Sequence, residues 1–357
     1  MVGGGIAGLT TALAFAKAEA SVRVFEQAKE IAEVGAGLQI TPNGMRALLA
    51  LGVDVAPRGV CATAVIPTDA VSGRPITRLD LRSQSPGYVF LHRADLIDAL
   101  AEAAAEAGVS IHLGARVEQP LEKADLTVAA DGIRSHFRPI VAGPEDPFFT
   151  GQVAWRAIVE HADDPVARIW MAPGRHVVTY PLTGGRLNVV AVEERETWAA
   201  EGWAHQDDPA NLRAAFADCA SELKDILTKV TDCHIWGLFR REIADAWHRG
   251  GTVLVGDAAH PTLPFLAQGA NLAIEDGYVL ARCCSEHGIE AGLAQYQALR
   301  KPRVDRAINA ANANAVNYHL GGLRRVASHQ VLRTIGTVAP RAFLGRLDWL
   351  YGHDVTA

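Results

Sequence analysis

The sequence predicts an α/β protein in which a domain built on a parallel β-sheet is interrupted by an inserted antiparallel sheet and followed by a helical C-terminal portion. Three observations support this class. A glycine cluster opens the chain and leads into a helical pattern and then an apolar strand, which is the order of a βαβ unit. Short β-rich stretches separated by Pro-Gly and Gly-Gly turns fill residues 148–194. Helical patterns dominate after residue 255.

Length and composition exclude several classes of protein. The 357 residues suggest two domains at roughly 150 residues each. With 49% hydrophobic and 21% charged residues, the chain has the composition of an ordinary globular protein with a sizeable core. The 34 basic and 40 acidic residues give a net charge of -6, so no general attraction to nucleic acid is expected.

The five cysteines show no CxxC spacing, so we expect free thiols in a reducing compartment, without a disulfide framework or a metal site. No apolar run approaches the 18 or so residues of a membrane span. The N-terminus lacks the basic start and cleavage site of a signal peptide. The expected location is therefore cytoplasmic.

Residues 1–147 are expected to form the first part of the main domain. Their helical and strand patterns alternate, and Gly108 stands where a helix stop belongs. The expected helices are 6–20, 42–51 and 93–107, and the expected strands are 22–25, 110–113 and 126–130.

Residues 148–250 are expected to form the inserted sheet domain, and residues 251–357 the second part of the main domain with its helical C-terminus. In the insertion the expected strands are 151–160, 167–171, 176–180 and 187–192, followed by a helix over 209–229. A buried strand over 252–255 begins the last part.

The opening glycines fit the pattern G-x-G-x-x-G. Gly3, Gly5 and Gly8 lack Cβ atoms, so backbone N–H groups there can approach a pyrophosphate at a helix N-terminus. Glu26 ends the next strand, where an acid can accept hydrogen bonds from ribose hydroxyls. The alternative is a glycine turn that binds no ligand. Only Met1 and Val2 precede Gly3, so the sequence predicts either an upstream start or a central strand shorter than the usual five or six residues.

Two further motifs follow predicted strands. The first is Asp131-Gly132-Ile133-Arg134-Ser135-His136-Phe137-Arg138, and the second is Gly256-Asp257-Ala258-Ala259-His260-Pro261. With the glycine loop, and in the same order along the chain, these segments resemble the fingerprints of the flavoprotein aromatic hydroxylases. Within that family the sequence looks most similar to salicylate, 3-hydroxybenzoate and hydroxynicotinate hydroxylases. The resemblance covers nearly the whole chain and implies a Rossmann-like FAD-binding domain with an inserted β-sheet substrate domain.

The resemblance also implies which residues hold FAD. Gly3, Gly5 and Gly8 would hold its pyrophosphate, as the residue types alone suggest. Asp131 is expected to serve FAD and nicotinamide binding from a distance. The remaining expected contacts are Glu26 to the adenosine ribose, Arg93 beside the diphosphate and ribityl chain, Val117 near the adenine, Asp257 to a ribityl hydroxyl, and Gly269 and Ala270 to the isoalloxazine edge.

For the catalytic base, His176 and Tyr180 are the candidates. They lie four apart on a predicted strand and so project to one face of the sheet. The resemblance places such a pair beside the substrate, and a histidine can take a phenol proton at neutral pH. The alternative is that His176 only ends a strand. His260 is the next candidate, although a structural role is expected for it, and Trp155 and Arg156 are possible contacts to substrate or flavin.

The implied reaction is hydroxylation of a phenolic or related aromatic acid by O2 through a flavin hydroperoxide. NADH or NADPH would dock transiently, because the chain has no second dinucleotide motif. Two alternatives remain: a hydroxylase of larger hydrophobic rings, such as a quinone precursor or polyketide, and a FAD-binding protein without turnover. The apolar segment 341–351 suits core or homodimer packing better than contact with lipid.

Overall fold

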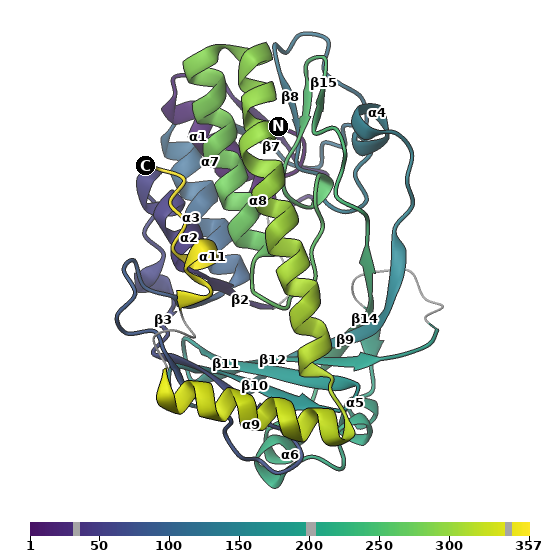
Figure 1. Cartoon of the computed structure of the whole chain (residues 1–357). Helices are drawn as coiled ribbons and strands as arrows, with labels where there is room; N and C mark the ends of the chain where they lie inside the picture. Colours follow the sequence, from purple (N-terminus) through teal and green to yellow (C-terminus); the bar gives the residue numbers. More distant parts are fainter. Residues whose placement is uncertain (31–35, 198–204, 340–344) are drawn as a thin grey trace.

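The computed structural model describes residues 1–30, 36–197, 205–339 and 345–357. Two parts are stacked along the long axis of the molecule (Figure 1). The upper part is an α/β layer structure that contains both chain ends, and the lower part is a broad sheet (Figure 1). The fold therefore has the α/β class, the second sheet and the helical C-terminal portion expected from the sequence.

The upper part is built on a parallel core that Val2 joins at its centre. Val2 forms parallel bridges to Phe25 and to Ala129, and its N–H donates to the carbonyl of Val128 over 2.8 Å. The single bridge residue Val2 thus links both halves of the sheet. The strands of this layer are β1 (Arg23–Phe25), β7 (Ser110–His112), β8 (Thr127–Ala129), β15 (His248–Arg249) and β16 (Thr252–Leu254).

Helices of the upper part cover this layer and pack tightly on one another. At the crossing of the first and the seventh helix, a Cβ on Gly277 would lie 2.8 Å from the backbone nitrogen of Thr11. Leu9 and Leu13 are fully buried there. The helices are α1 (Ile6–Lys17), α2 (Pro42–Ala50), α3 (Arg93–Glu106), the short α4 (Arg138–Ala142), α7 (Gly269–His287) and α8 (Ile289–Tyr318), with 3-10 turns η1 (Ala56–Arg58) and η2 (Gly256–Ala258).

The lower sheet has eight strands in the order β13-β14-β9-β12-β11-β10-β4-β5. It is antiparallel except that β4 lies parallel to β10. Two of its strands, β4 and β5, come from before residue 148, so the sheet also draws on the first part of the chain. The bounds are β4 (Ala64–Asp69), β5 (Leu79–Asp80), β9 (Phe148–Glu160), β10 (Val166–Ala172), β11 (Arg175–Leu182), β12 (Arg186–Glu194), β13 (His205–Asp207) and β14 (Cys233–Arg240).

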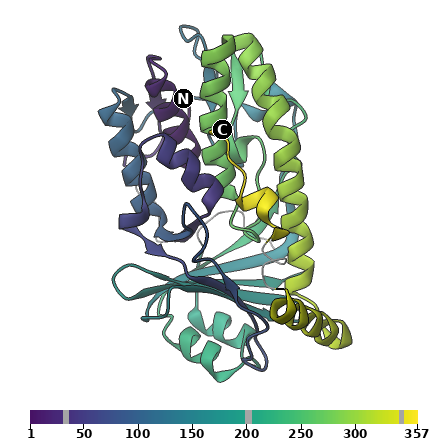
Figure 2. The same cartoon turned by 60° about the vertical axis from the view of Figure 1, so that its left-hand side comes forward.

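One face of this sheet is sealed by α5 (Pro209–Ala215) and α6 (Ser221–Thr228), which lie beneath it (Figure 2). Trp155, Trp170 and Phe216 belong to the core between them. The expectation of one helix over 209–229 is wrong, because the helix is interrupted between α5 and α6. There the N–H of Ala220 donates to the carbonyl of Ala70. The opposite face of the sheet is turned toward the upper part (Figure 2).

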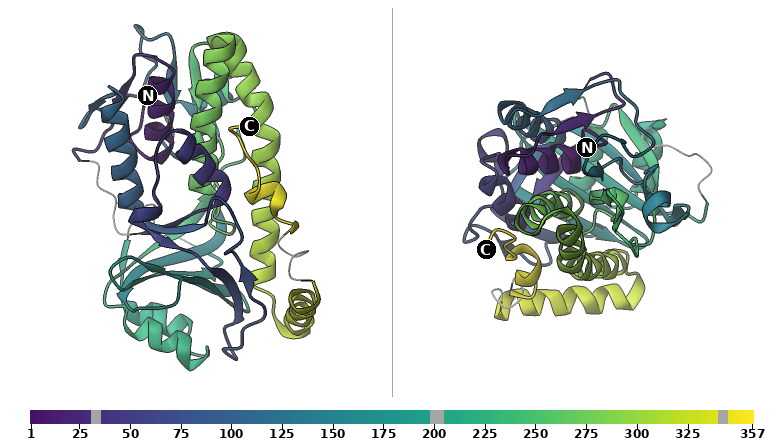
Figure 3. Two further views of the ribbon diagram at one scale, coloured as in Figure 1. Left: turned by 90° about the vertical axis from the view of Figure 1, so that its left-hand side faces the viewer. Right: turned by 90° about the horizontal axis from the view of Figure 1, so that it is seen from above.

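A small antiparallel sheet and the C-terminal helices connect the two parts. The small sheet has the order β2-β6-β3. From the upper part, α8 runs down to the lower sheet, where α9 lies across its edge (Figures 1 and 3). No helix among the described residues is long and apolar enough to span a membrane. The bounds are β2 (Gly37–Ile40), β3 (Val60–Cys61), β6 (Val89–His92), α9 (Gly322–Val338) and α11 (Asp348–Tyr351).

Candidate active site

The glycine loop has the geometry of a phosphate cradle. A Cβ on Gly8 would overlap the carbonyl oxygen of Gly3, and one on Gly3 would overlap the carbonyl oxygen of Ala130. A Cβ on Gly5 would meet no atom within 4 Å. Gly3 and Gly8 are therefore required for close packing of the loop, whereas Gly5 faces open space at the N-terminus of α1, where an anion is favoured.

Glu26 supports this loop. Its Oε2 accepts a hydrogen bond from the N–H of Gly4 at 2.6 Å, and its Oε1 accepts one from the N–H of Ala28 at 2.8 Å. An ionised carboxylate has about four acceptor positions. Glu26 can therefore hold the loop and still accept from a ribose hydroxyl. Val117, the expected adenine contact, is half-buried against the main core.

The motif that begins at Asp131 is folded around its own polar side chains. Asp131 Oδ2 accepts from the N–H of His136 at 2.8 Å, and Ser135 Oγ accepts from the N–H of Arg138 at 3.0 Å. The other oxygen of Asp131, Oδ1, is buried and has no partner among the residues that the structure describes. Since Gly3 packs against the backbone of Asp131, this oxygen lies near the glycine loop.

Asp257 belongs to the 3-10 turn η2, and it is exposed although protein atoms surround it. Burial raises the pKa of its carboxyl group, and His260 and Arg93 oppose the rise. Burial also lowers the pKa of Arg93, against the effect of Asp257. The carboxylate and the guanidinium therefore face the same region from two elements, η2 and α3.

His260 holds the same turn rather than facing the open space. It is almost fully buried, its ring lies against that of Trp247, and its Nε2 lies 2.5 Å from Asp276 Oδ2. The same Asp276 oxygen accepts from the N–H of Gly256 at 3.0 Å. These contacts fit the structural role expected for His260.

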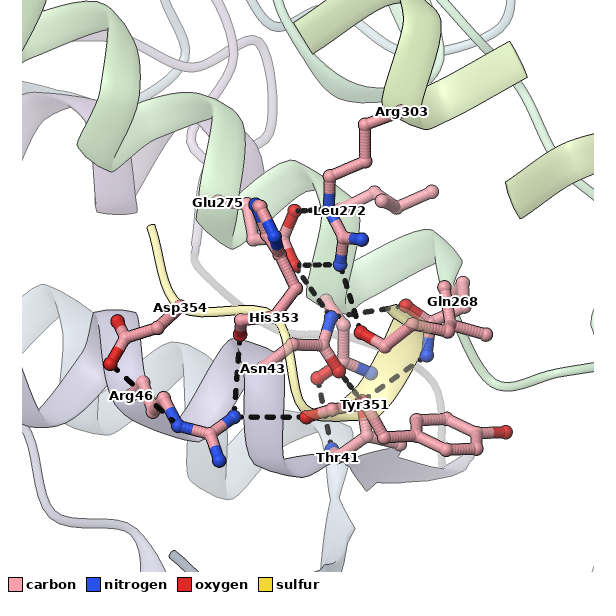
Figure 4. Close-up of polar contacts among 12 residues, drawn as sticks. Thr41, Asn43, Arg46, Gln268, Leu272, Glu275, Arg303, Tyr351, His353 and Asp354 are labelled. Carbon is pink, nitrogen blue, oxygen red and sulfur yellow. Dashed lines mark hydrogen bonds and ion pairs between the residues drawn. The ribbon is translucent and has the colours of Figure 1, made fainter. Parts of the chain in front are cut away.

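A polar hub fixes the N-terminus of α7, where Gly269 and Ala270 lie (Figure 4). No side chain caps this helix end. Asn43 Nδ2 donates to Gln268 Oε1 at 3.1 Å and to Glu275 Oε1 at 2.7 Å, and Gln268 Nε2 donates to Thr41 Oγ1 at 3.2 Å (Figure 4). The first N–H groups of α7 are thus held in place and remain available for an acceptor.

The C-terminal segment is tied to this hub through arginines. Arg303 Nη2 bonds Glu275 Oε1 at 2.7 Å and donates to the carbonyl of Leu350, while Arg46 donates to the carbonyls of Tyr351 and His353 (Figure 4). Leu350 is fully buried, and Trp349 lies under the guanidinium of Arg306. Leu350 and Trp349, at the end of the segment 341–351, are thus packed inside the protein. Residues 341–344, which include Phe343 and Leu344, lie outside the described residues.

A cavity of about 410 Å³ lies between the lower sheet and the residues that precede α7. It is mainly apolar, and Arg346 is the one charged residue among the described residues that line it. Tyr88 donates to Gln39 inside it at 2.5 Å. The other lining residues are Val65, Pro67, Leu79, Leu81, Gln84, Ala167, Ile169, Met171, Val178, Pro264, Phe265, Leu266, Ala267, Asn314, Asn317, Tyr318, Ser328, Val331, Leu332, Leu347 and Tyr351.

His176 and Tyr180 lie on the same face of β11 as Val178, which lines the cavity between them. Neither of the pair is itself among the lining residues. The ring of His176 lies 5.3 Å from those of Phe265 and Tyr318, which form the cavity wall in front of it.

Tyr180 lies at the other end of the cavity. Its ring is tilted against that of Phe90 at 5.2 Å, and Asn188 is opposite it in the register. Burial raises its pKa, against the effect of Arg156.

Arg156 and Trp155 point in opposite directions from β9. The guanidinium of Arg156 lies 4.4 Å from the ring of Trp236, and burial lowers its pKa to about 10. Trp155 is buried on the far face, where its Nε1 donates to Asp207 at 2.7 Å. The expectation that Trp155 meets substrate or flavin is therefore wrong, because alternate strand residues face opposite sides of the sheet.

These residues fit FAD: a glycine cradle with one open position, a buried acceptor beside it, an exposed carboxylate at Asp257 and an uncapped helix N-terminus. A family model described as "FAD binding domain" matches residues 1–311. The 3-amino-4-hydroxybenzoate 2-monooxygenase of Streptomyces cremeus is 34% identical over 99% of this chain and 94% of that protein. The chain belongs to the FAD-dependent aromatic hydroxylases.

Other hydroxylases are similar over the same length. The 3-hydroxybenzoate 6-hydroxylase of Polaromonas naphthalenivorans is 31% identical over 99% of this chain and 96% of that protein. Among solved structures, HpxO of Klebsiella pneumoniae complexed with FAD and uric acid has a TM-score of 0.86 and 26% identity over 98% of this chain and 96% of that one. The family and fold inferred from the three motifs are confirmed, as are FAD as cofactor and monooxygenase as enzyme class.

Glu275, Asp276 and Arg300 support the site of this flavoprotein but had no signal in the sequence. Arg300 bonds Asp276 at 2.8 Å and Glu275 at 2.5 Å. Arg138, the last residue of the second motif, bonds the carbonyl of Ala259. Burial alone would raise the pKa of Asp276, but His260 and Arg300 lower it to about 2. No cluster of potential metal ligands occurs among the described residues.

Proposed function

We propose that this flavoprotein hydroxylates a small phenolic or related aromatic acid, using NADH or NADPH as reductant. The observation that carries the proposal is the cavity beside the N-terminus of α7. Its volume suits a one-ring substrate, and its walls are mainly apolar with a few polar groups that can orient a ring. Curated relatives named for aminohydroxybenzoate, hydroxybenzoate and hydroxynicotinate support the same class of substrate.

Arg346 would recognise the acid group of the substrate. It makes no ion pair or side-chain hydrogen bond with any described residue, and it is the one charged group along the described cavity walls. A guanidinium pairs well with a carboxylate because both can form two parallel hydrogen bonds. An aromatic acid placed with its carboxylate toward Arg346 would lay its ring along Val178 and Ile169.

The residues that would hold FAD come from the upper part of the molecule, which contains α1, α3 and α7 (Figure 1). Gly3, Gly5, Gly8 and the N-terminus of α1 would hold the pyrophosphate, with Glu26 at the ribose. When bound, FAD supplies the redox chemistry: it accepts hydride from the reduced nicotinamide and activates O2. The N-terminus of α7 would stabilise negative charge on its ring edge. The other proposed contacts are Arg93, Val117, Asp131, Asp257, Gly269 and Ala270.

His176 would act as the general base that removes the phenolic proton, and Tyr180 would orient the substrate. Loss of this proton makes the ring carbon a better nucleophile toward oxygen. His176 lies behind Phe265 and Tyr318, which line the cavity. This position is compatible with the role of base, because catalytic hydrogen bonds are often long in ligand-free structures. The apolar walls would exclude water from the reacting groups.

The test is oxidation of NADH and NADPH by the FAD-loaded enzyme across hydroxybenzoates and hydroxypyridines, with product identification. We expect one acid to give a hydroxylated product, and Arg346→Gln to raise its KM about tenfold, equivalent to about 1.4 kcal/mol. The uncharged amide of the same substrate should be insensitive to that change. Arg324→Gln, on the exposed side of α9, is the matched control. Hydrogen peroxide as the sole product with every acid would refute the proposal.

A further inference from the structure

A chain of hydrogen bonds leads from His176 to the protein surface. His176 Nδ1 lies 2.7 Å from His319 Nε2, and His319 Nδ1 lies 2.7 Å from Glu194 Oε1. The three residues come from β11, the turn after α8, and the end of β12. His176 is 2% exposed, whereas the side chain of Glu194 is 55% exposed. The chain thus joins the buried cavity wall to solvent.

The turn between β10 and β11 holds the three residues in register. The N–H of Gly174 donates to the carbonyl of His319 at 3.0 Å, and the N–H of Glu194 donates to the carbonyl of Gly174 at 2.9 Å. His176 also pairs with Val192 across the sheet, two residues before Glu194. The backbone therefore fixes both ends of the chain independently of the side-chain bonds.

The carboxylate sets the tautomer of each imidazole. An ionised Glu194 can only accept, so the proton of His319 resides on Nδ1 and its Nε2 carries a lone pair. That lone pair accepts from His176, which must then carry its proton on Nδ1. The remaining ring nitrogen, Nε2 of His176, is left unprotonated and basic.

The surroundings of His176 disfavour a lasting positive charge. Burial lowers the pKa of His176 well below its ordinary value, and His319 lowers it further. The pKa of His319 is also lowered by burial, although Glu194 opposes this. The other neighbours of His176 are Phe265 and Tyr318, whose phenol has its pKa raised by burial, and Met171 and Val192 in the register. None of these neighbours supplies a negative charge that would stabilise a protonated His176. A proton that His176 accepts must therefore be passed to another group.

We propose that His319 and Glu194 form a proton relay that carries the substrate's phenolic proton from His176 to solvent. This rests on the proposed role of His176 as base. The substrate O–H bond breaks as a proton binds Nε2 of His176, the Nδ1 proton of His176 passes to Nε2 of His319, and the Nδ1 proton of His319 passes to Glu194 and then to water. No electrons are exchanged. Return of one proton by the same path to the product's phenolate restores both tautomers.

The experiment measures proton release when the phenolic substrate identified in the panel binds to the oxidised, FAD-loaded enzyme in weak buffer with a pH indicator. The absorbance of bound phenolate is followed in parallel. Glu194→Gln and His319→Gln should slow proton release and phenolate formation at neutral pH by about 10- to 100-fold, at the low end of proton-transfer effects. Glu194→Asp, or added imidazole buffer for Glu194→Gln, should restore part of the rate.

Glu193→Gln is the matched control, because Glu193 precedes Glu194 on β12 but pairs with Arg195 at 3.0 Å. It should leave proton release unchanged. Wild-type rates and pH profiles in both Glu194→Gln and His319→Gln would overturn the relay. If proton release is at the wild-type rate in those two variants but slow in His176→Gln, the relay is refuted and His176 is still the base. If proton release is at the wild-type rate in His176→Gln as well, both the base and the relay are refuted.

Discussion

The guanidinium of Arg138 donates to the carbonyl oxygen of Ala259 over 3.1 Å, although 121 positions separate the two residues. A second bond reaches the carbonyl of Ala258 at 3.3 Å, and Glu145 balances the charge at 2.6 Å. The arginine that ends the second motif therefore braces the turn that carries Asp257. Arg138 thus connects the second motif to the third. A long, positively charged side chain is needed at this position, because it must reach both carbonyls and Glu145.

Arg138→Met should weaken both the fold and FAD binding. The change removes the hydrogen bonds to the carbonyls of Ala258 and Ala259 and the ion pair with the partly exposed Glu145, so we expect the free energy of unfolding to fall by about 1–3 kcal/mol. The Kd for FAD, measured by quenching of flavin fluorescence, should rise at least tenfold, or about 1.4 kcal/mol. Arg134→Met changes an exposed arginine of the same motif and should alter neither quantity. A stable Arg138→Met protein with normal FAD affinity would contradict the bracing role.

Two glycines of the first motif should respond differently to alanine. In Gly8→Ala the new methyl group overlaps the carbonyl of Gly3, which outweighs the gain of about 1 kcal/mol in helix propensity, so the FAD-free protein should melt at a lower temperature. In Gly5→Ala the methyl group meets only open space, and the FAD-free protein should lose at most about 1 kcal/mol at the helix cap.

FAD titration distinguishes the two roles. The Gly5→Ala methyl group would occupy the space proposed for the pyrophosphate, so the Kd for FAD should rise tenfold or more, about 1.4 kcal/mol. Unchanged FAD affinity in this variant would place the pyrophosphate elsewhere.

His176→Gln keeps the size and some hydrogen bonding of the side chain but cannot take a proton at neutral pH. Product formation should fall by roughly 100- to 10,000-fold while FAD remains bound. The defect should shrink as the pH rises toward the pKa of the substrate phenol, since solvent then supplies the phenolate. Tyr180→Phe should raise KM more than it lowers kcat. An unaltered pH profile of kcat/KM for His176→Gln would show that the base lies elsewhere.

Asp276 should contribute stability that is lost in acid. Its pKa of about 2 lies below the value of about 3.9 for an unfolded chain, so the ionised form stabilises the fold above about pH 4. That contribution, about 2–3 kcal/mol, disappears as the pH falls toward 2. Asp276→Asn should flatten this acid limb in urea unfolding curves and lower stability at neutral pH. Asp245→Asn, at an exposed carboxylate, should keep the wild-type curve.

The parts of the fold that the sequence predicted are those with strong local signals. The helices at Ile6–Lys17 and Arg93–Glu106 and the strands Val166–Ala172 and Arg186–Glu194 all lie close to their expected ranges. Their signals are runs of apolar, helix-forming or β-branched residues that end at turn residues. The three motifs predicted the cofactor because each has its signal in a short run of sequence: glycines without side chains in the first, and an aspartate in a turn after a strand in the other two.

Other elements depend on partners far along the chain. Strand β4 contains Pro67, which lacks the N–H that a central strand uses, so its pattern predicted no strand. It forms because β10 pairs with it over its whole length, from Ala64 to Asp69. Strand β14 was missed too, since Gly237 lies at a shift in its register.

The same limit applies to the candidate site. Asp276 and Arg300 are ordinary helix residues in the sequence, and only the crossing of α7 and α8 makes them a buried pair. His319 ends a helix with no motif around it, and its contact with His176 depends on where α8 meets the sheet. Local patterns identified the groups proposed to touch FAD, and also Arg138 and His260, which support the turn at Asp257, but they gave no sign of Asp276, Arg300 or His319.

The close crossing of α1 with α7 also bears on how the protein is made. Leu9 and Leu13 of α1 are fully buried in a core completed by α7, whose first residue is Gly269. At a synthesis rate of about 5–20 residues per second, α1 leaves the ribosome roughly 10–50 s before its partner exists. During that interval α3 can already pack on α1, but the larger contact of α1 with α7 cannot form. Its yield in cells should therefore depend on chaperones that shield the N-terminal segment until the last quarter of the chain, which begins with α7, has been translated.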